Sequence, residues 1–198
     1  MSDERAPRRR LNPRFVLLCV LLALTLAVIA VGLGRLLAPS PAPEEADLPA
    51  YVVKDYLPVN EWSRPGDELK EIRGVVIHYV GNPGTSARAN RNYFASLASG
   101  KEQTYASNSR NDDTVSVEVC HPDETGEFSP VTYQRCVELT AWLCRTCRLD
   151  AEKDVIRHYD VTGKLCPLYY AEHPEAWETF LADVAEAVRG LEEAEKAA

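Results

Sequence analysis

The sequence carries little positive charge outside its N-terminal segment. Residues 1–37 hold six Arg against Asp3 and Glu4, a net charge of +4, whereas the whole chain has a net charge of −8. Residues 38–198 therefore carry −12. Proteins that bind nucleic acid neutralise phosphates with clustered Lys and Arg, so an acidic body of this kind argues against a nucleic-acid partner.

The sequence also lacks an internal repeat and an even set of cysteines in its main part. Cys19 lies in an apolar N-terminal run, and five cysteines follow: Cys120, Cys136, Cys144, Cys147 and Cys166. An odd number in an exported domain leaves one thiol outside any disulfide framework, and binding a metal is one use for it. The other four either pair or stay reduced. Cys144 and Cys147 have no nearby His or Cys pair to complete a second metal site, so we interpret them as small apolar core residues.

One long apolar run lies near the N-terminus. Residues 15–34 read FVLLCVLLALTLAVIAVGLG, long enough as a helix to cross a hydrocarbon core of about 30 Å. Arg8, Arg9, Arg10 and Arg14 lie close before the run, and the positive-inside rule then predicts a single-pass protein of the cell membrane with an extracytoplasmic body. The alternative is a cleaved signal peptide and a secreted product. The run is longer than a usual signal core, and no small-x-small cleavage site follows it.

The predicted organisation has five parts. Residues 38–50 (APSPAPEEADLPA) are rich in Pro and Ala, which is typical of an extended linker. We predict a cytoplasmic basic tail (1–14), a transmembrane anchor (15–37), this linker (38–50), the main folded domain (51–188) and a polar tail that frays (189–198).

Strand and helix signals alternate along the domain. Continuous or alternating apolar runs predict strands over 74–80, 114–120 and 154–159. Helical spacing and capping residues predict helices over 86–98, from Ser129-Pro130 to Cys147, and from Pro174 onward. This alternation predicts an α/β fold with a mixed central sheet flanked by helices.

Two metal-binding residue types stand close together near the C-terminus. His158 and Cys166 are eight residues apart, a spacing that suits a strand ending at the His, a turn at Gly163 and a return of the Cys to the same metal. His78 ends another apolar strand, and strand ends in α/β sheets are where ligand sites form. Taken alone, His78 is more simply read as a hydrogen-bonded core residue. Taken together, the three residues predict a zinc site with one open position, as in catalytic centres.

Two charged residues are candidates for the chemistry. Hydrolysis at zinc needs a group that handles the proton of the attacking water and a cation that stabilises the oxyanion. Glu118 lies on the polar side of the strand 114–120, and we predict a general base there rather than a plain surface Glu. Lys164 precedes Cys166 by two residues, and we predict that it stabilises the transition state; a solvated loop Lys is the alternative.

Three further polar residues are weaker candidates. His121 and His173 each precede a Pro and are interpreted as a turn residue and a helix-start residue. Asp160 either orients a ligand His or caps a turn.

Four motifs connect these residues to a known family. They are SRPG (63–66), VVIHYVGNPGTS (75–86), NSRNDDTVSVEVCHPDETGEF (108–128) and VIRHYDVTGKLCP (155–167). Through them the chain resembles zinc-dependent N-acetylmuramoyl-L-alanine amidases of the type 2 family. These amidases share their fold with the phage lysozyme-type amidases and the peptidoglycan recognition proteins. The resemblance spans residues 51–185.

The resemblance implies a specific reaction. It places Zn²⁺ at His78, His158 and Cys166 and gives Glu118 and Lys164 roles in hydrolysis. The bond cut is the amide between the lactyl group of N-acetylmuramic acid and the L-alanine of the stem peptide. The implied partner is therefore peptidoglycan.

The sequence departs from the family pattern at one place. Family members carry a further strand and hairpin between the first helix and the NSRN-like segment, whereas here residues 104–107 run directly into Asn108. Two strands of about five residues and a turn do not fit into this interval, so we expect an unpaired sheet edge beside residues 115–119. Three hypotheses follow: an active wall amidase, a peptidoglycan-binding module that has lost turnover, or a zinc hydrolase of another amide.

Overall fold

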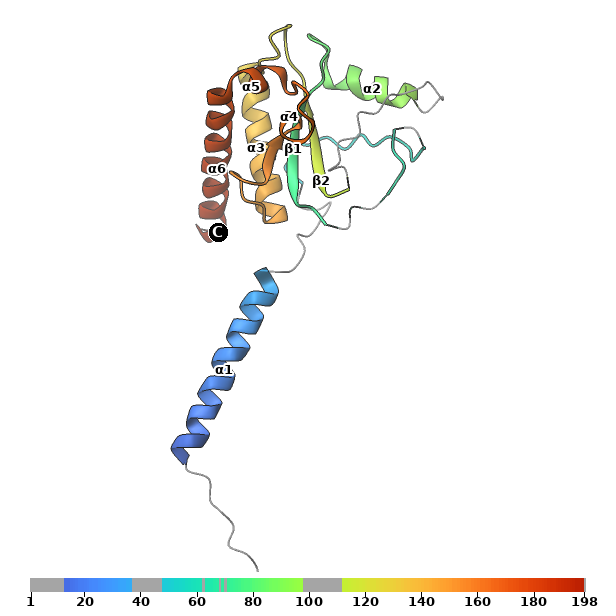
Figure 1. Cartoon of the computed structure of the whole chain (residues 1–198). Coiled ribbons are helices and arrows are strands. Elements are labelled where there is room, and N and C mark those ends of the chain that lie inside the picture. Colours follow the sequence, from blue (N-terminus) through green and yellow to red (C-terminus); the bar gives the residue numbers. More distant parts are fainter. Residues whose placement is uncertain are drawn as a thin grey trace, which may run out of the picture. The chain divides into compact units, whose positions relative to one another are not determined.

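The structure, a computed structural model, describes residues 13–36, 48–61, 63–67, 69, 71–97 and 112–197 (Figure 1). The chain divides into two compact units, Met1–Pro39 and Ser40–Ala198, which are described one after the other. The interval at 104–108, where we predict a missing hairpin, lies outside the described residues.

The first unit contains the helix α1 (Pro13–Leu36). It forms from the apolar run, and the large apolar side chains described along it are exposed. Among the helices of the described part of the chain, none combines the length and the hydropathy that crossing a membrane requires. The helix is therefore confirmed, but the predicted transmembrane anchor over 15–37 is not supported.

The second unit is built on a three-stranded sheet. Its strands are β1 (Gly74–Tyr79), β2 (Thr114–Val119) and β3 (Val155–Arg157), in the order β2-β1-β3. Both pairings are parallel, so the prediction of a mixed sheet is wrong for the strands that the structure describes. A helix follows each of β1 and β2 before the next strand, and parallel neighbours require such crossovers.

The central strand is covered on both faces. Val75, Val76 and Ile77 of β1 are fully buried, as expected for a continuous apolar run in a parallel sheet. Val75 and Ile77 join the hydrophobic core together with Val119 of β2 and Val155 of β3. Because side chains alternate along a strand, His78 projects from the opposite face.

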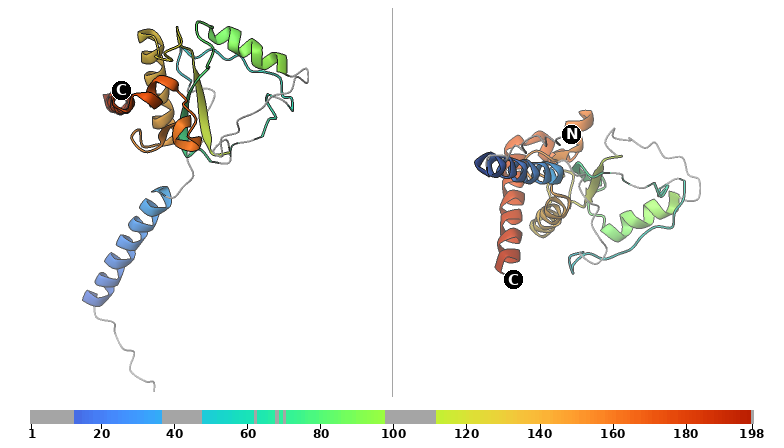
Figure 2. Two further views of the ribbon diagram at one scale, coloured as in Figure 1. Left: turned by 45° about the horizontal axis from the view of Figure 1, so that its top comes forward. Right: turned by 90° about the horizontal axis from the view of Figure 1, so that it is seen from below.

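Helices lie on both sides of this sheet (Figures 1 and 2). The helices α3 (Pro130–Cys147) and α6 (Pro174–Ala197) pack against each other on one side, and α2 (Ala87–Leu97) lies on the other. The α3 helix starts as predicted, because Ser129 Oγ accepts the N–H of Thr132 and Pro130 opens the first turn. On α6, Phe180 is fully buried and stacks on Trp177 with ring centroids 5.1 Å apart.

The C-terminal third corrects several boundaries. The strand predicted over 154–159 spans only 155–157, and two short helices that we did not predict follow it: α4 (His158–Thr162) and α5 (Leu168–Glu172). The tail predicted to fray from residue 189 continues α6 as far as Ala197. Its Ala, Glu and Lys residues have high helix propensity, and Glu195 forms an ion pair with Arg145 of α3.

Gly74 marks a close approach between β1 and the chain that leads into β3. The carbonyl of Asp154 accepts the N–H of Val75 at 2.9 Å, and a Cβ added to Gly74 would lie 2.7 Å from that carbonyl oxygen.

Gly74→Ala must therefore push two backbones apart, and we expect it to lower the free energy of unfolding by about 1–3 kcal/mol in urea titrations. Gly190→Ala on α6 is the control, because its new Cβ meets nothing within 4 Å and should stabilise the protein by about 0.5–1 kcal/mol. Equal effects of the two substitutions would contradict this account.

A candidate metal centre

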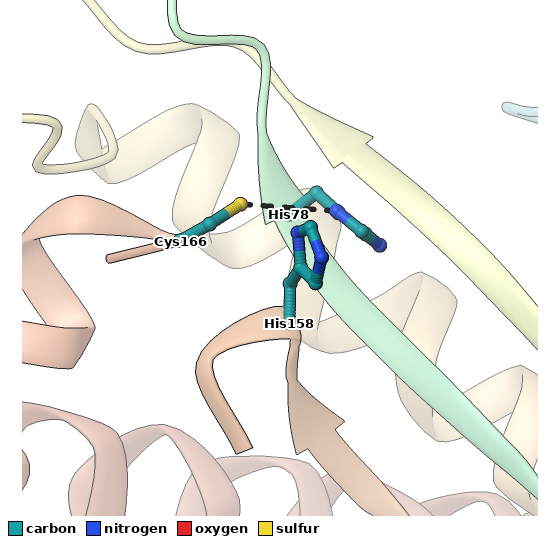
Figure 3. A group of neighbouring side chains, drawn as sticks. All are labelled: His78, His158 and Cys166. Atoms are coloured by element: carbon teal, nitrogen blue, oxygen red, sulfur yellow. Dashed lines mark hydrogen bonds between the residues drawn. The ribbon is translucent and has the colours of Figure 1, made fainter. Parts of the chain in front are cut away.

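Three segments that are distant in the sequence supply the candidate ligands (Figure 3). His78 is the penultimate residue of β1, His158 begins α4 directly after β3, and Cys166 lies between α4 and α5. In the parallel sheet, Ile77 is paired with Arg157, so the residues that follow them, His78 and His158, lie at the same carboxyl end of these strands. This is the strand-end position that the sequence predicts.

The ligand atoms of these residues converge. Those of His78, His158 and Cys166 all lie within 4.8 Å of one another, and all three residues are buried. His78 Nδ1 lies 3.7 Å from Cys166 Sγ, and the two imidazole centroids are 4.6 Å apart. Separations of this size suit a single ion with bonds of about 2.0–2.3 Å to nitrogen and sulfur.

The imidazoles also lack other partners. Neither nitrogen of His158, nor Nε2 of His78, has a hydrogen-bond partner among the residues that the structure describes. A buried polar atom without a partner costs free energy, and a bound cation would give one nitrogen of each ring a partner. Two imidazoles and one thiolate form a donor set that fits zinc with one position open.

The surroundings keep both imidazoles neutral. Burial, followed by the charges of His158 and Lys164, lowers the pKa of His78 to about 4. Burial and Lys164 lower the pKa of His158 as well. A neutral imidazole is the form that binds a metal ion.

The thiol of Cys166 is protonated in the metal-free protein. Burial raises its pKa to about 11, while the backbone N–H of Tyr79 and the charge of Lys164 act in the opposite direction. A metal would therefore displace a proton from Cys166 on binding. Tyr79 escaped the sequence analysis because its contribution is a backbone contact, which leaves no side-chain signal.

Glu118 stands beside the ligands. It is the register partner of His78 in β2, and its Oε1 lies 3.8 Å from His78 Nδ1. Partial burial raises the pKa of Glu118 to about 7, and Lys164 acts in the opposite direction; 44% of the side chain remains exposed. A cavity of about 290 Å³ reaches Glu118, with Leu57 and Phe94 in its walls. Lys164 itself is exposed.

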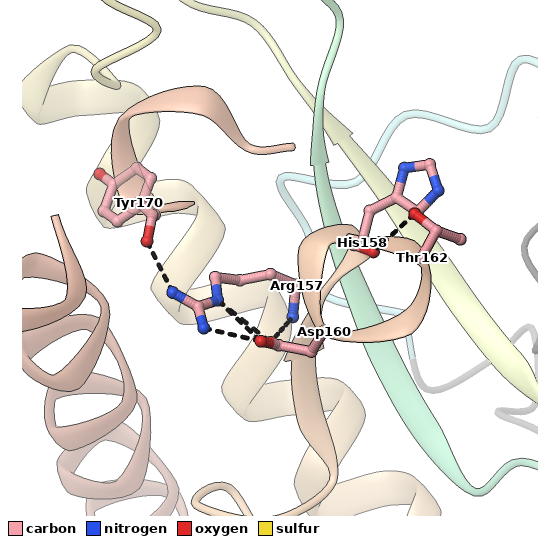
Figure 4. A network of polar contacts seen from close by, with 5 residues as sticks. All are labelled: Arg157, His158, Asp160, Thr162 and Tyr170. Atoms are coloured by element: carbon pink, nitrogen blue, oxygen red, sulfur yellow. Dashed lines mark hydrogen bonds and ion pairs between the residues drawn. The ribbon is translucent and has the colours of Figure 1, made fainter. Parts of the chain in front are cut away.

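The loop that carries His158 and Cys166 turns where the sequence predicts. Gly163 has φ of +76°, a conformation that suits glycine, and its N–H binds the carbonyl of Tyr159. Asp160 caps α4, because its Oδ2 accepts the N–H of Arg157 at 2.8 Å (Figure 4). Of the two roles open for Asp160, capping is the one observed.

The remaining histidines lie outside the ligand cluster. His121 is buried, and its Nδ1 lies 2.7 Å from the carbonyl oxygen of Asp123. His173 ends α5 directly before Pro174 opens α6, which agrees with its predicted place at a helix start.

The fold and this cluster define an α/β domain with a candidate three-ligand metal site, and comparisons with known proteins add its family. A family model described as N-acetylmuramoyl-L-alanine amidase matches residues 68–168, just over half of the chain. The chain belongs to this family.

Curated relatives carry the same description. The chain is 31% identical over 164 residues to N-acetylmuramoyl-L-alanine amidase CwlL of Bacillus licheniformis. This alignment covers 65% of this chain and 45% of CwlL. It is 28% identical over 163 residues to N-acetylmuramoyl-L-alanine amidase BlyA of Bacillus subtilis (strain 168), covering 63% and 44%. The chain thus spans less than half the length of these relatives.

Solved structures share the fold. The catalytic domain of XlyA superposes with a TM-score of 0.52 at 18% identity, covering 66% of this chain and 96% of that domain. A mutant endolysin from Bacillus subtilis gives the same TM-score and identity, covering 65% and 95%. At this identity the likeness concerns the fold alone.

Zinc should stabilise the folded protein through the three ligands. Adding zinc to chelator-treated protein is expected to raise Tm, because an ion bound at about 100 times its Kd contributes about 2.7 kcal/mol. Cys166→Ala should remove this rise in a thermal melt. Cys136→Ala, which also removes a buried thiol but not a ligand, should keep it. A rise of equal size in Cys166→Ala would show that zinc binds elsewhere.

Proposed function

We propose that this protein is a zinc-dependent amidase that cuts the bond between N-acetylmuramic acid and the L-alanine of the stem peptide in peptidoglycan. Family membership supports the reaction, and the names of the curated relatives agree with it. The observation that carries the proposal is the convergence of His78, His158 and Cys166 beside Glu118.

The ligand residues have distinct tasks in this proposal. Zinc held by His78, His158 and Cys166 would supply Lewis acidity that polarises the amide carbonyl and acidifies water. The ligands come from opposite ends of the domain sequence, so they fix the position of the ion relative to both β1 and the loop after β3. Burial of all three keeps bulk water away from them.

Glu118 handles the proton. Its carboxylate takes a proton from the attacking water as the oxygen adds to the lactyl carbonyl carbon, and returns it to the nitrogen of L-alanine as the C–N bond breaks. A carboxyl whose pKa is raised to about 7 can act in both directions near neutral pH. Lys164 faces the negative charge that develops on the carbonyl oxygen and stabilises it.

The substrate determines where the domain works. Peptidoglycan lies outside the cytoplasmic membrane, so we place the site of action there, in cell-wall remodelling or lysis. The acidic body agrees with a partner other than nucleic acid.

A binding module without turnover is the second candidate. The alignment with CwlL is 164 positions long but includes only 65% of this 198-residue chain. Some of its positions are therefore CwlL residues that have no counterpart here. A missing segment near 104–108 would produce such gaps. A module that only binds peptidoglycan has no need of Glu118 and Lys164 beside the ligands, and this favours the enzyme.

The decisive test measures zinc content and the release of free stem peptide from purified peptidoglycan. We expect one zinc per chain and peptide release from the unaltered protein. Zinc without release would favour the binding module, and a folded protein that retains no zinc would contradict the metal site.

Glu118→Gln tests the assigned base. The amide keeps the size of the side chain but cannot take up the proton, so we expect kcat to fall by about 10²–10⁴-fold with zinc content unchanged. Glu178→Gln, on the exposed side of α6, is the matched control and should behave as the unaltered protein. Unchanged turnover in Glu118→Gln would remove Glu118 from the mechanism.

A further inference from the structure

Two of the three candidate ligands lie on one short loop. His158 begins the loop and Cys166 ends it, and the N–H of Tyr159 binds the carbonyl of Cys166 at 2.8 Å to close it. The loop joins a strand of three residues to a helix of five. Such short elements contribute little stability of their own, so the position of both ligands depends on what fastens the loop to the domain.

Arg157 is the residue that fastens it (Figure 4). Its Nη2 donates to Asp160 Oδ1 at 2.6 Å, and its Nε donates to the same carboxylate. Its Nη1 donates to the carbonyl of Tyr170 at 2.8 Å. One guanidinium therefore joins α4, which starts with His158, to α5, which follows Cys166.

The same guanidinium is anchored to the core. It lies 5.4 Å from the ring centroid of Trp177 on α6 and 5.2 Å from that of Tyr159, distances at which a cation is attracted to an aromatic ring. The Arg157 side chain is only 13% exposed. Low exposure makes its charge-assisted bonds stronger than those of a surface pair.

Arg157 acts without touching the metal centre. It is paired in register with Ile77, one position before His78, so its side chain lies on the core side of the sheet with Trp177. The ligands lie on the opposite side. Its effect on them therefore passes through the loop backbone.

We propose that Arg157 is a positioning residue that holds the segment from His158 to Tyr170, which comprises this loop and the start of α5, in its metal-binding shape before the metal arrives. The inference rests on the metal site of the proposed function. An arginine is needed, because its planar fork reaches a carboxylate and a carbonyl at once, whereas a lysine offers a single point charge. Capping of α4 alone does not require the fork, since Asp160 already binds the backbone N–H of Arg157.

The test is Arg157→Lys in the full chain, with zinc affinity measured by competition with a chromogenic chelator. We expect zinc to bind about 10–100-fold more weakly, the range typical for residues that orient ligands. In the metal-free protein, hydrogen exchange at the amides of Tyr159 and Ala171 should become faster, because their acceptors, the carbonyls of Cys166 and Pro167, lie in this segment. Amides within α3 should not change.

Two controls separate positioning from simple loss of stability. Arg145→Lys weakens an Arg–carboxylate pair that lies away from the ligands, the Arg145–Glu195 pair between α3 and α6, and should leave zinc affinity unchanged. Val184→Ala creates a cavity in the core on α6 and should lower Tm without weakening zinc binding at temperatures where the protein is folded. Asp160→Asn is a second variant of the Arg157–Asp160 contact; it keeps a capping oxygen but removes the charge.

The outcomes are distinguishable. Zinc affinity within twofold of the unaltered protein in both Arg157→Lys and Asp160→Asn would overturn the proposal, and so would an equal loss in Val184→Ala. If Arg157→Lys and Asp160→Asn bind zinc more weakly and the unaltered protein releases no stem peptide, the positioning role is supported and the amidase is rejected. Absence of zinc binding in the unaltered protein would overturn both.

Discussion

The pairing of β1 with β3 is the interaction on which the site depends. These strands are hydrogen-bonded neighbours although about half of the domain separates them in sequence, and their register brings His78 beside His158. A shift of one residue would turn one imidazole to the opposite face of the sheet. The fully buried side chains of Val75 and Ile77 oppose such a shift, because it would carry them out of the core formed with α3 and α6.

The strands, the start of α3 and the candidate ligands can be predicted from the sequence, because burial and helix capping each require a recognisable local pattern of residues. The run at 74–80 predicts a doubly covered strand, the Ser129-Pro130 pair predicts the start of α3, and the spacing of His158, Gly163 and Cys166 predicts the loop geometry. The ligand set follows from these elements, since parallel strands expose their ends at a common edge.

The features that escaped prediction depend on long-range contacts. No local pattern shows that the strands are all parallel, that Arg157 reaches the carbonyl of Tyr170, or that the N–H of Tyr79 meets the thiol of Cys166. The persistence of α6 to Ala197 belongs to the same class, because a polar segment at a chain end frays by default and is held here by Arg145 of another helix.

The distribution of ligands has a consequence for biogenesis. His78 and Cys166 are 88 residues apart, and β3, which leads directly into His158, is synthesised after β1 and β2. A nascent or partly translocated chain therefore offers at most an isolated imidazole, which competes poorly for a scarce ion against dedicated chelators. In the proposed zinc enzyme, loading with metal must wait until β3 has paired with β1. A cell that exports this domain would thus populate the centre from the metal pool of the compartment in which folding is completed, and not from the pool at the ribosome.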